Sequence, residues 1–100
     1  MSTFEFRLFV SGGTPHSQKA IENLEKIRDQ YLQGDCQIRI VDVLTDPESA
    51  EKNKILATPT LVRVSPTPQR RVIGDLSDFQ RVITVMGIDP NANRLEHGEM

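Results

Sequence analysis

This sequence has few of the cysteine and histidine side chains that most often carry covalent and acid–base chemistry near neutral pH. The chain has one cysteine, Cys36, and two histidines, so it can form neither an intramolecular disulfide nor a Cys/His zinc cage. His16 could act as a general base, but no third group is placed to orient it, and its position in the first turn of an expected helix favours solvent exposure. We expect Cys36 to be a buried structural thiol, and we assign no catalytic residue, no metal ligand and no cofactor.

Gly12-Gly13 could cradle a phosphate, because the pair stands just before an expected helix. It lacks the Lys-Ser/Thr of a P-loop and the third glycine of a dinucleotide-binding loop, so a turn is the better interpretation.

Basic side chains gather in the second half of the chain, at Lys52, Lys54, Arg63, Arg70 and Arg71. The whole chain has 12 Lys+Arg against 14 Asp+Glu and a formal charge of −2, so no net positive charge draws it to nucleic acid or anionic lipid. We expect no nucleic-acid and no membrane partner. Two interpretations of the basic residues stay open, a solvated face and a surface that docks another protein.

The elements that position these residues begin with a strand. The 100 residues are 37% hydrophobic and 26% charged, the balance of one globular domain. Apolar and polar residues alternate over 3–10, which predicts a strand. Thr14 as N-cap and Pro15 at the first helical position predict a helix that runs to about Leu32.

A second strand follows Gly34, which supplies the left-handed end of that helix. Residues 38–43 carry apolar side chains on both alternating sides, so we expect an interior strand covered on both faces. A strand, a helix and a strand in this order make a right-handed crossover with parallel strands.

The second half predicts a short helix, a hairpin and a last helix. Thr45 to Glu48 contain a capping side chain, a proline and a first-turn acid, and start a short exposed helix. Residues 60–64 and 70–73 form two strands whose link is too short for a parallel crossover, so we expect an antiparallel hairpin. Ser77 and Gln80 form a capping box for a third helix that ends at Gly87.

The resulting order βαβαββα, with Thr58-Pro59 before the third strand, is the topology of the thioredoxin fold, an α/β class. Thioredoxin-like redox proteins place a cysteine pair where the first strand meets the first helix, because the helix N-terminus stabilises a thiolate. Here that position reads Thr14-Pro15-His16-Ser17, and hydroxyls cannot exchange disulfides. We expect the fold without the redox chemistry.

Two features of the sequence indicate that parts of the chain could adopt more than one conformation. Three X–Pro bonds lie within ten residues, at Pro59, Pro66 and Pro68, and each can be cis at a cost of about 0.5–1 kcal/mol. We expect Pro59 to be cis and the other two to stiffen the hairpin loop. Four β-branched residues, 82–85, follow the last helix cap, so local preference for a strand conflicts with capping for a helix. Such a conflict arises when tertiary packing outweighs the local preference. It also arises when a chain has two accessible folds.

The hydropathy of the chain and the composition of its two ends indicate its location and its domain bounds. Apolar stretches are far shorter than the roughly 20 residues that span a bilayer, and residues 1–7 have no signal-peptide pattern, so we expect a cytoplasmic protein. We predict a single domain over residues 1–88 and a disordered C-terminal tail over residues 89–100.

Several stretches carry a family resemblance over about residues 5–83. They are LFVSG (8–12) with Thr14-Pro15, VDVL (41–44), KILATPTL (54–61), the prolines Pro66 and Pro68, and RVIGDLS (71–77). In this order they strongly resemble the KaiB family of circadian-clock proteins.

The resemblance implies a non-enzymatic regulator that binds the N-terminal ATPase ring of a KaiC-type hexamer and modulates its phosphorylation and ATPase cycle. It also implies KaiA or a histidine kinase as further partners. Two folds are implied as well. The thioredoxin-like βαβαββα monomer binds, and a dimeric or tetrameric ground state, βαββααβ, has a rearranged C-terminal half. Pro59, Pro66 and Pro68 would be the prolines of the switch.

The contacts that the resemblance implies lie in the second-helix region and on the hairpin. They are Asp46, Pro47, Lys52, Lys54, Ile55, Leu56, Arg70 and Arg71. The first alternative is a redox-inactive thioredoxin-like adaptor or sensor domain of a two-component or stress-response pathway. A second is a thioredoxin-like enzyme that handles peroxide or glutathione.

Overall fold

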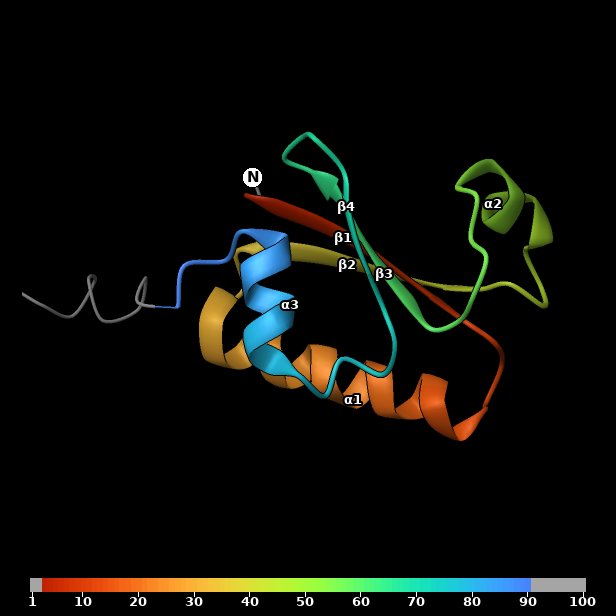
Figure 1. The fold of residues 1–100 in the computed structure, drawn as a ribbon, viewed down its shortest axis with the longest axis horizontal. Helices are drawn as coiled ribbons and strands as arrows, with labels where there is room; N and C mark the ends of the chain where they lie inside the picture. Colours follow the sequence, from red (N-terminus) through yellow and green to blue (C-terminus); the bar gives the residue numbers. More distant parts are fainter. Residues whose placement is uncertain (1–2, 91–100) are drawn as a thin grey trace, which may run out of the picture.

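The computed structural model of the chain describes residues 3–90 and contains one four-stranded sheet. The elements in chain order are β1 (Phe4–Val10), α1 (Pro15–Ile27), η1 (Arg28–Leu32), β2 (Cys36–Asp42), α2 (Pro47–Lys52), β3 (Thr60–Ser65), β4 (Arg70–Ile73) and α3 (Phe79–Met86). The strand order is β2-β1-β3-β4, with β2 parallel to β1 and the other neighbours antiparallel (Figure 1). The predicted order of elements, the parallel crossover and the antiparallel hairpin are confirmed.

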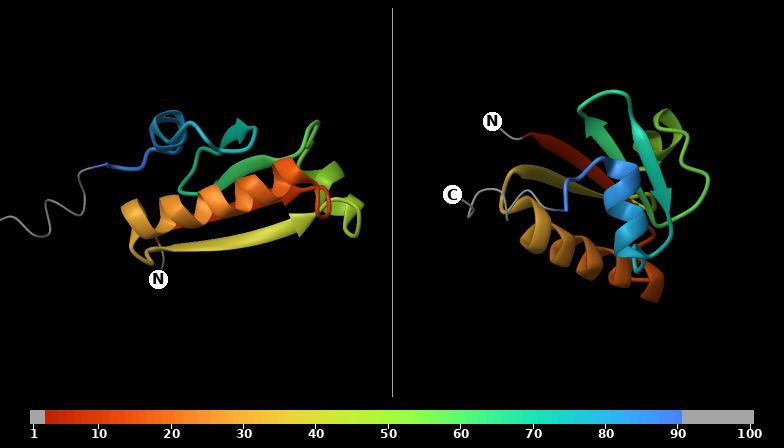
Figure 2. Two further views of the ribbon diagram at one scale, coloured as in Figure 1. Left: turned by 90° about the horizontal axis from the view of Figure 1, so that it is seen from below. Right: turned by 60° about the vertical axis from the view of Figure 1, so that its left-hand side comes forward.

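The two faces of the sheet are covered differently. On one face α1 and α3 pack against alternate residues of the strands, and the buried cluster there includes Phe6, Leu8, Leu24, Leu61 and Met86 (Figure 2). The other face has a smaller cluster of Phe9, Val41 and Val62. The short helix α2 lies beyond one end of the sheet and leaves much of this second face open (Figure 1).

The predicted interior position of β2 is wrong. β2 is an edge strand, and β1 takes the interior place because it pairs with both β2 and β3. The edge has a neighbour on one side only, so Ile40 is 49% exposed although it belongs to the β-branched run. Apolar residues on both sides of a strand indicate packing on two faces, and they carry no information about which strands flank it.

Helix starts and ends follow the predictions with three differences. Thr14 is the N-cap residue of α1, but its side chain makes no capping bond. The last turn of the predicted first helix is the π-helical η1, which ends at Leu32 as expected. The predicted Ser77 cap is wrong: Asp78 is the N-cap of α3, and its carboxylate accepts a bond from the Arg81 amide at 3.2 Å. An aspartate next to the serine is an equally good cap, so the pattern alone does not choose between them.

Arg63 is a structural residue and does not contribute to a basic surface. It is buried on the helix-covered side of β3, where Nη1 donates to the Met86 carbonyl and Nη2 to the Pro68 carbonyl, each at 2.7 Å. A cation at the C-terminal end of α3 is favourable because the helix dipole places partial negative charge there. Gly87 ends α3 at φ 71°, as predicted, and a Cβ at this position would lie 3.0 Å from Nη1 of Arg63.

The C-terminal segment adopts the helical alternative. The β-branched residues 82–85 lie in α3, so the structure has the βαβαββα arrangement and the alternative ground-state fold stays a prediction. The bonds Thr58–Pro59, Ser65–Pro66 and Thr67–Pro68 are cis, which confirms the expectation for Pro59. Of the predicted tail, residues 91–100 lie outside the described part of the chain. Within residues 3–90, no helix is both long enough and apolar enough to cross a membrane.

Candidate protein-docking surface

The junction of β1 and α1 holds hydroxyl groups that are bonded to one another and to the backbone. Ser17 is fully buried, and its Oγ accepts a bond from the Ser11 amide at 3.0 Å. The Ser11 Oγ lies 2.6 Å from the Thr58 Oγ1. His16 is exposed on the first turn of α1, as predicted. These groups hold the junction together, and none is a thiol that could exchange a disulfide.

Cys36 lies at the other end of the sheet, where it pairs with Phe4 at the start of β1. It is partly buried, and this burial raises the pKa of its thiol. A raised pKa keeps the thiol protonated and a poor nucleophile, which fits the predicted structural role.

α2 begins with a strongly bonded cap. The Asp46 carboxylate accepts bonds from the Ser49 hydroxyl at 2.8 Å and from the Ser49 amide at 3.2 Å. These bonds lower the pKa of Asp46, because they stabilise the charged form. Pro47 occupies the first helical position, so the predicted start of this helix is confirmed.

α2 ends in a Schellman motif with a lysine at the left-handed position. The Ile55 amide donates to the Ala50 carbonyl at 2.9 Å, and the Lys54 amide donates to the Glu51 carbonyl at 3.1 Å. Lys54 has φ 54°, a conformation that costs a residue with a Cβ about 1 kcal/mol or more relative to glycine. The side chain of Lys54 is exposed.

Arg71 joins this helix end to the sheet. From β4 its guanidinium donates to two successive backbone carbonyls, Nη1 to Lys54 at 3.1 Å and Nη2 to Asn53. The structure thus brings two of the predicted contact residues, Arg71 and Lys54, together.

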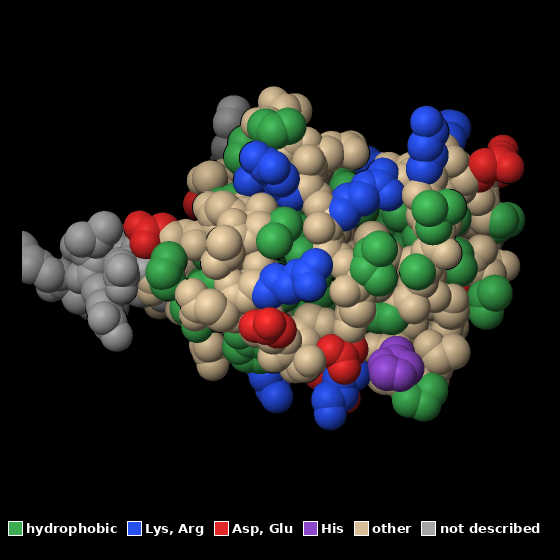
Figure 3. Space-filling view, viewed as in Figure 1, with side chains coloured by type: hydrophobic (Ala, Val, Ile, Leu, Met, Phe, Trp, Pro, Cys, Tyr) green, Lys and Arg blue, Asp and Glu red, His purple; other side chains and the backbone are tan. Residues whose placement is uncertain are grey.

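Large apolar side chains are exposed before α2, after α2 and at the end of β4. Leu56 is 95% exposed, Leu44 is 71% exposed and Ile73 is 62% exposed. A cavity of about 240 Å³ lies beside Leu56, lined by Ala50, Ile55, Leu56 and four other residues. In Figure 3 basic and hydrophobic side chains lie side by side over the region of α2. We call Leu44, Lys52, Lys54, Leu56, Arg71 and Ile73 the α2-end surface.

The predicted contact residues divide into two groups. Asp46, Pro47 and Lys52 lie on or at the start of α2, and Lys54, Ile55 and Leu56 follow it directly. Arg70 is apart from them: it is opposite Arg63 in the hairpin, whereas Arg71 is opposite Val62, and successive strand residues point to opposite faces.

Four exposed or partly exposed residues of this region were not predicted from the sequence. Leu44 and Ile73 are apolar, and the alternation of Ile73 against buried Val72 is the signal that could have found it. Arg7 and Arg39 are opposite one another on the open face, in the same cross-strand row as Val62 and Arg71. The Nε of Arg7 is buried and has no hydrogen-bond partner.

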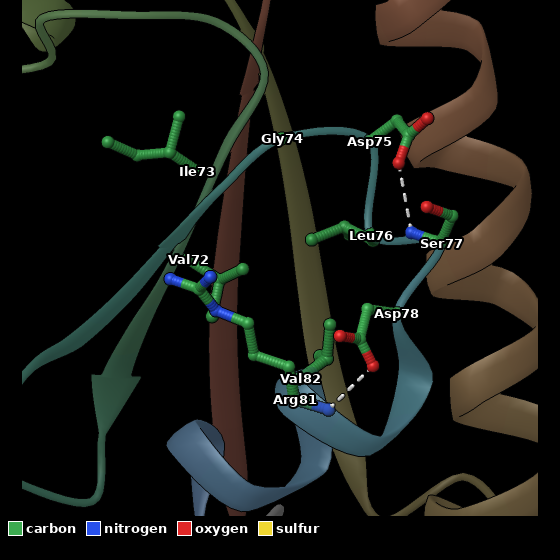
Figure 4. A pocket seen from close by; sticks show the side chains of 9 residues that line it. All are labelled: Val72, Ile73, Gly74, Asp75, Leu76, Ser77, Asp78, Arg81 and Val82. Carbon is green, nitrogen blue, oxygen red and sulfur yellow. Dashed lines mark hydrogen bonds between the residues drawn. The ribbon is translucent and has the colours of Figure 1, made fainter.

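A second hollow, of about 150 Å³, lies between β4 and α3 and is lined by residues 72–78, Arg81 and Val82 (Figure 4). Two carboxylates line it, but Asp75 accepts from the Ser77 amide and Asp78 from the Arg81 amide. Asn23 of α1 donates to the Asp75 carbonyl at 2.8 Å. These contacts shape the turn between the two elements, so the hollow is a structural feature of the fold.

Comparison with known proteins gives a family and a fold. A family model described as the KaiB domain matches residues 7–88. The circadian clock oscillator protein KaiB of Nostoc punctiforme is 42% identical over 97 residues, which cover 97% of this chain and 91% of that protein. The circadian clock oscillator protein KaiB1 of Synechocystis sp. is 45% identical over 87 residues, which cover 87% of this chain and 81% of that protein.

Solved structures with the same fold are more distant in sequence. The N-terminal domain of Synechococcus elongatus SasA has a TM-score of 0.70 at 19% identity, and the match covers 100% of this chain and 91% of that one. A chloroplastic thioredoxin z has a TM-score of 0.71 at 20% identity, with 86% and 77% covered. These similarities confirm the thioredoxin-like α/β fold.

Proposed function

Because the chain belongs to the KaiB family, we propose that it is a clock-type regulator that acts by binding and carries out no catalysis of its own. Its partner in this proposal is the N-terminal ATPase ring of a KaiC-type hexamer, whose phosphorylation and ATPase cycle it modulates. The docking site is the α2-end surface.

The observation that carries the proposal is the exposed Leu56 on a segment whose backbone is held by hydrogen bonds. A large apolar side chain that is 95% exposed contributes nothing to the packing of this domain. Its neighbours Lys54 and Arg71 provide positive charge beside it. Binding energy at protein interfaces is concentrated in a few apolar or arginine side chains surrounded by polar contacts, and the α2-end surface has this composition.

The β1–α1 junction supports binding over catalysis. In the redox branch of this fold that position holds the reactive thiols, and here it holds the bonded hydroxyls of Ser11, Ser17 and Thr58. A regulator needs no reactive group there, whereas a peroxide- or glutathione-handling enzyme does.

The proposal includes a second fold in the free protein. The thioredoxin-like monomer is the binding form, and it exchanges with a dimeric or tetrameric ground state in which the C-terminal half is rearranged. The β-branched residues 82–85 support this exchange, because they favour a strand locally yet lie in α3. A minor binding form lowers the apparent affinity by its fractional population.

The proposal is tested with the KaiC-type ATPase of the same organism and two variants. Leu56→Asp places a charge at the centre of the surface, so we expect the dissociation constant to rise by at least about tenfold, as for a hot-spot residue. Arg70→Gln is the matched control on the opposite side of β4 and should leave the constant unchanged. An equal effect of the two substitutions, or none from Leu56→Asp, would remove the α2-end surface from the proposal.

A further inference from the structure

We infer that Arg71 is a positioning residue for the α2-end surface: its guanidinium fixes the backbone of residues 53–56, and its role in docking is exerted through Lys54 and Leu56. This inference rests on the proposed function, and it goes further by separating the residue that holds the surface from the residues that meet the partner.

The first step is the geometry of the guanidinium. Nη1 and Nη2 of Arg71 donate to the carbonyls of Lys54 and Asn53, two neighbouring acceptors at the end of α2. Asn53 is the C-cap of α2, where a helix carries partial negative charge, and Lys54 follows it directly. A planar fork with fixed donors can bridge two such carbonyls at once, and a lysine ammonium, a single point of charge on a flexible stem, cannot reproduce that arrangement.

The second step is that the direction of the Leu56 side chain depends on its backbone. Its side chain is 95% exposed, so packing does not hold it, and its direction depends on the backbone before it. That backbone includes Lys54 at φ 54°, a conformation that a residue with a Cβ leaves readily. The two backbone bonds of the Schellman motif hold this turn from within, and Arg71 adds the side-chain contact that ties it to β4.

The third step is the contrast with Arg70. Both arginines are exposed and lie on β4, but they point to opposite sides of the strand, and only Arg71 is bonded to the helix end. Arg70 is therefore a matched control with the same charge, the same strand and the same exposure class.

The test compares Arg71→Lys and Arg71→Gln with Arg70→Lys and Arg70→Gln. In the free protein, amide hydrogen exchange at Lys54 and Ile55 reports the turn directly, because both amides are bonded within it. We expect exchange there to accelerate at least about tenfold in both Arg71 variants, the effect of losing one charge-assisted hydrogen bond, and to stay unchanged in both Arg70 variants. Exchange in β1 serves as the check that each variant is folded.

The binding measurement separates positioning from direct contact. If Arg71 acts through the segment, Arg71→Lys weakens binding to the KaiC-type ATPase as much as Arg71→Gln does, and the salt dependence of binding keeps its slope. If Arg71 instead contacts an acidic side chain of the partner, Arg71→Lys binds nearly as well as the wild type. Only Arg71→Gln then reduces the slope of affinity against salt concentration. Unchanged exchange at Lys54 and Ile55 in both Arg71 variants overturns the inference.

Failure of the proposed function gives a different pattern. In that case the wild-type protein itself does not bind the ATPase, whereas the exchange measurement still decides whether Arg71 holds the segment.

Discussion

At the scale of single residues, the side chains that look most reactive are structural, and the candidate site is made of residues with no chemistry of their own. Cys36 is partly buried with a raised pKa, and Ser17 is bonded to the Ser11 amide. The exposed Leu56 and the left-handed Lys54 belong to the proposed docking surface. The sequence pointed to Lys54 and Leu56 through the family resemblance, but it could not show that Arg71 is bonded to the backbone beside them.

Lys54→Gly should stabilise the protein. Glycine adopts φ 54° without a Cβ penalty, so we expect a gain of about 1 kcal/mol, or about 4–8 °C in Tm for a domain of this size. Lys52→Gly, inside α2, is the opposite control and should destabilise, because glycine is a poor helix former. A thermal melt followed by circular dichroism checks both, and a lower Tm for Lys54→Gly would contradict the assigned backbone conformation.

Asp46 should give the protein a stability that depends on pH. Its carboxyl pKa is lowered by the bonds from Ser49, so the stabilisation is present above the unfolded-state pKa and is lost as the pH falls through the lower folded-state value. We expect the difference in urea midpoint between the wild type and Asp46→Ala to be constant from about pH 5 to 7 and to shrink below about pH 4.

Asp46→Asn is the control for this titration. An asparagine also caps a helix but does not ionise in this range, so its difference from Asp46→Ala should not change with pH. If the difference in urea midpoint between the wild type and Asp46→Ala grew as the pH fell, the cap would not be stabilising the Asp46 carboxylate.

At the scale of elements, local patterns predicted the helices and the hairpin, and they failed where the answer depends on distant parts of the chain. The start of α2 follows from Asp46 and Pro47 alone. The edge position of β2 depends on the pairing of β1 with β3, which no residue of β2 encodes. The buried site of Arg63 likewise depends on α3 ending above β3.

Arg63 should be one of the most important residues for stability. Arg63→Leu leaves the Met86 and Pro68 carbonyls without their donor, so we expect a loss of about 2–4 kcal/mol in the free energy of unfolding. Urea unfolding measures it, with Arg70→Leu as an exposed control that should change the value by no more than about 0.5 kcal/mol. Similar small effects for both would mean that the bond between β3 and α3 contributes little.

At the scale of the whole molecule, the fold is that of a thioredoxin and the lineage is that of KaiB. The fold class could be predicted from the order of elements and the position of Pro59. The open face of the sheet could not, because it follows from α2 being short and lying beyond one end of the sheet rather than over it. This arrangement leaves the α2-end surface free to meet a partner, which is the basis of the proposed function.

Binding by a minor monomeric form is tested by size-exclusion chromatography with light scattering, on the protein alone and then during hours of incubation with the KaiC-type ATPase and nucleotide. We expect a dimer or tetramer pool that is slowly consumed while a complex larger than the ATPase hexamer grows. A persistent monomer that never joins the hexamer would contradict it.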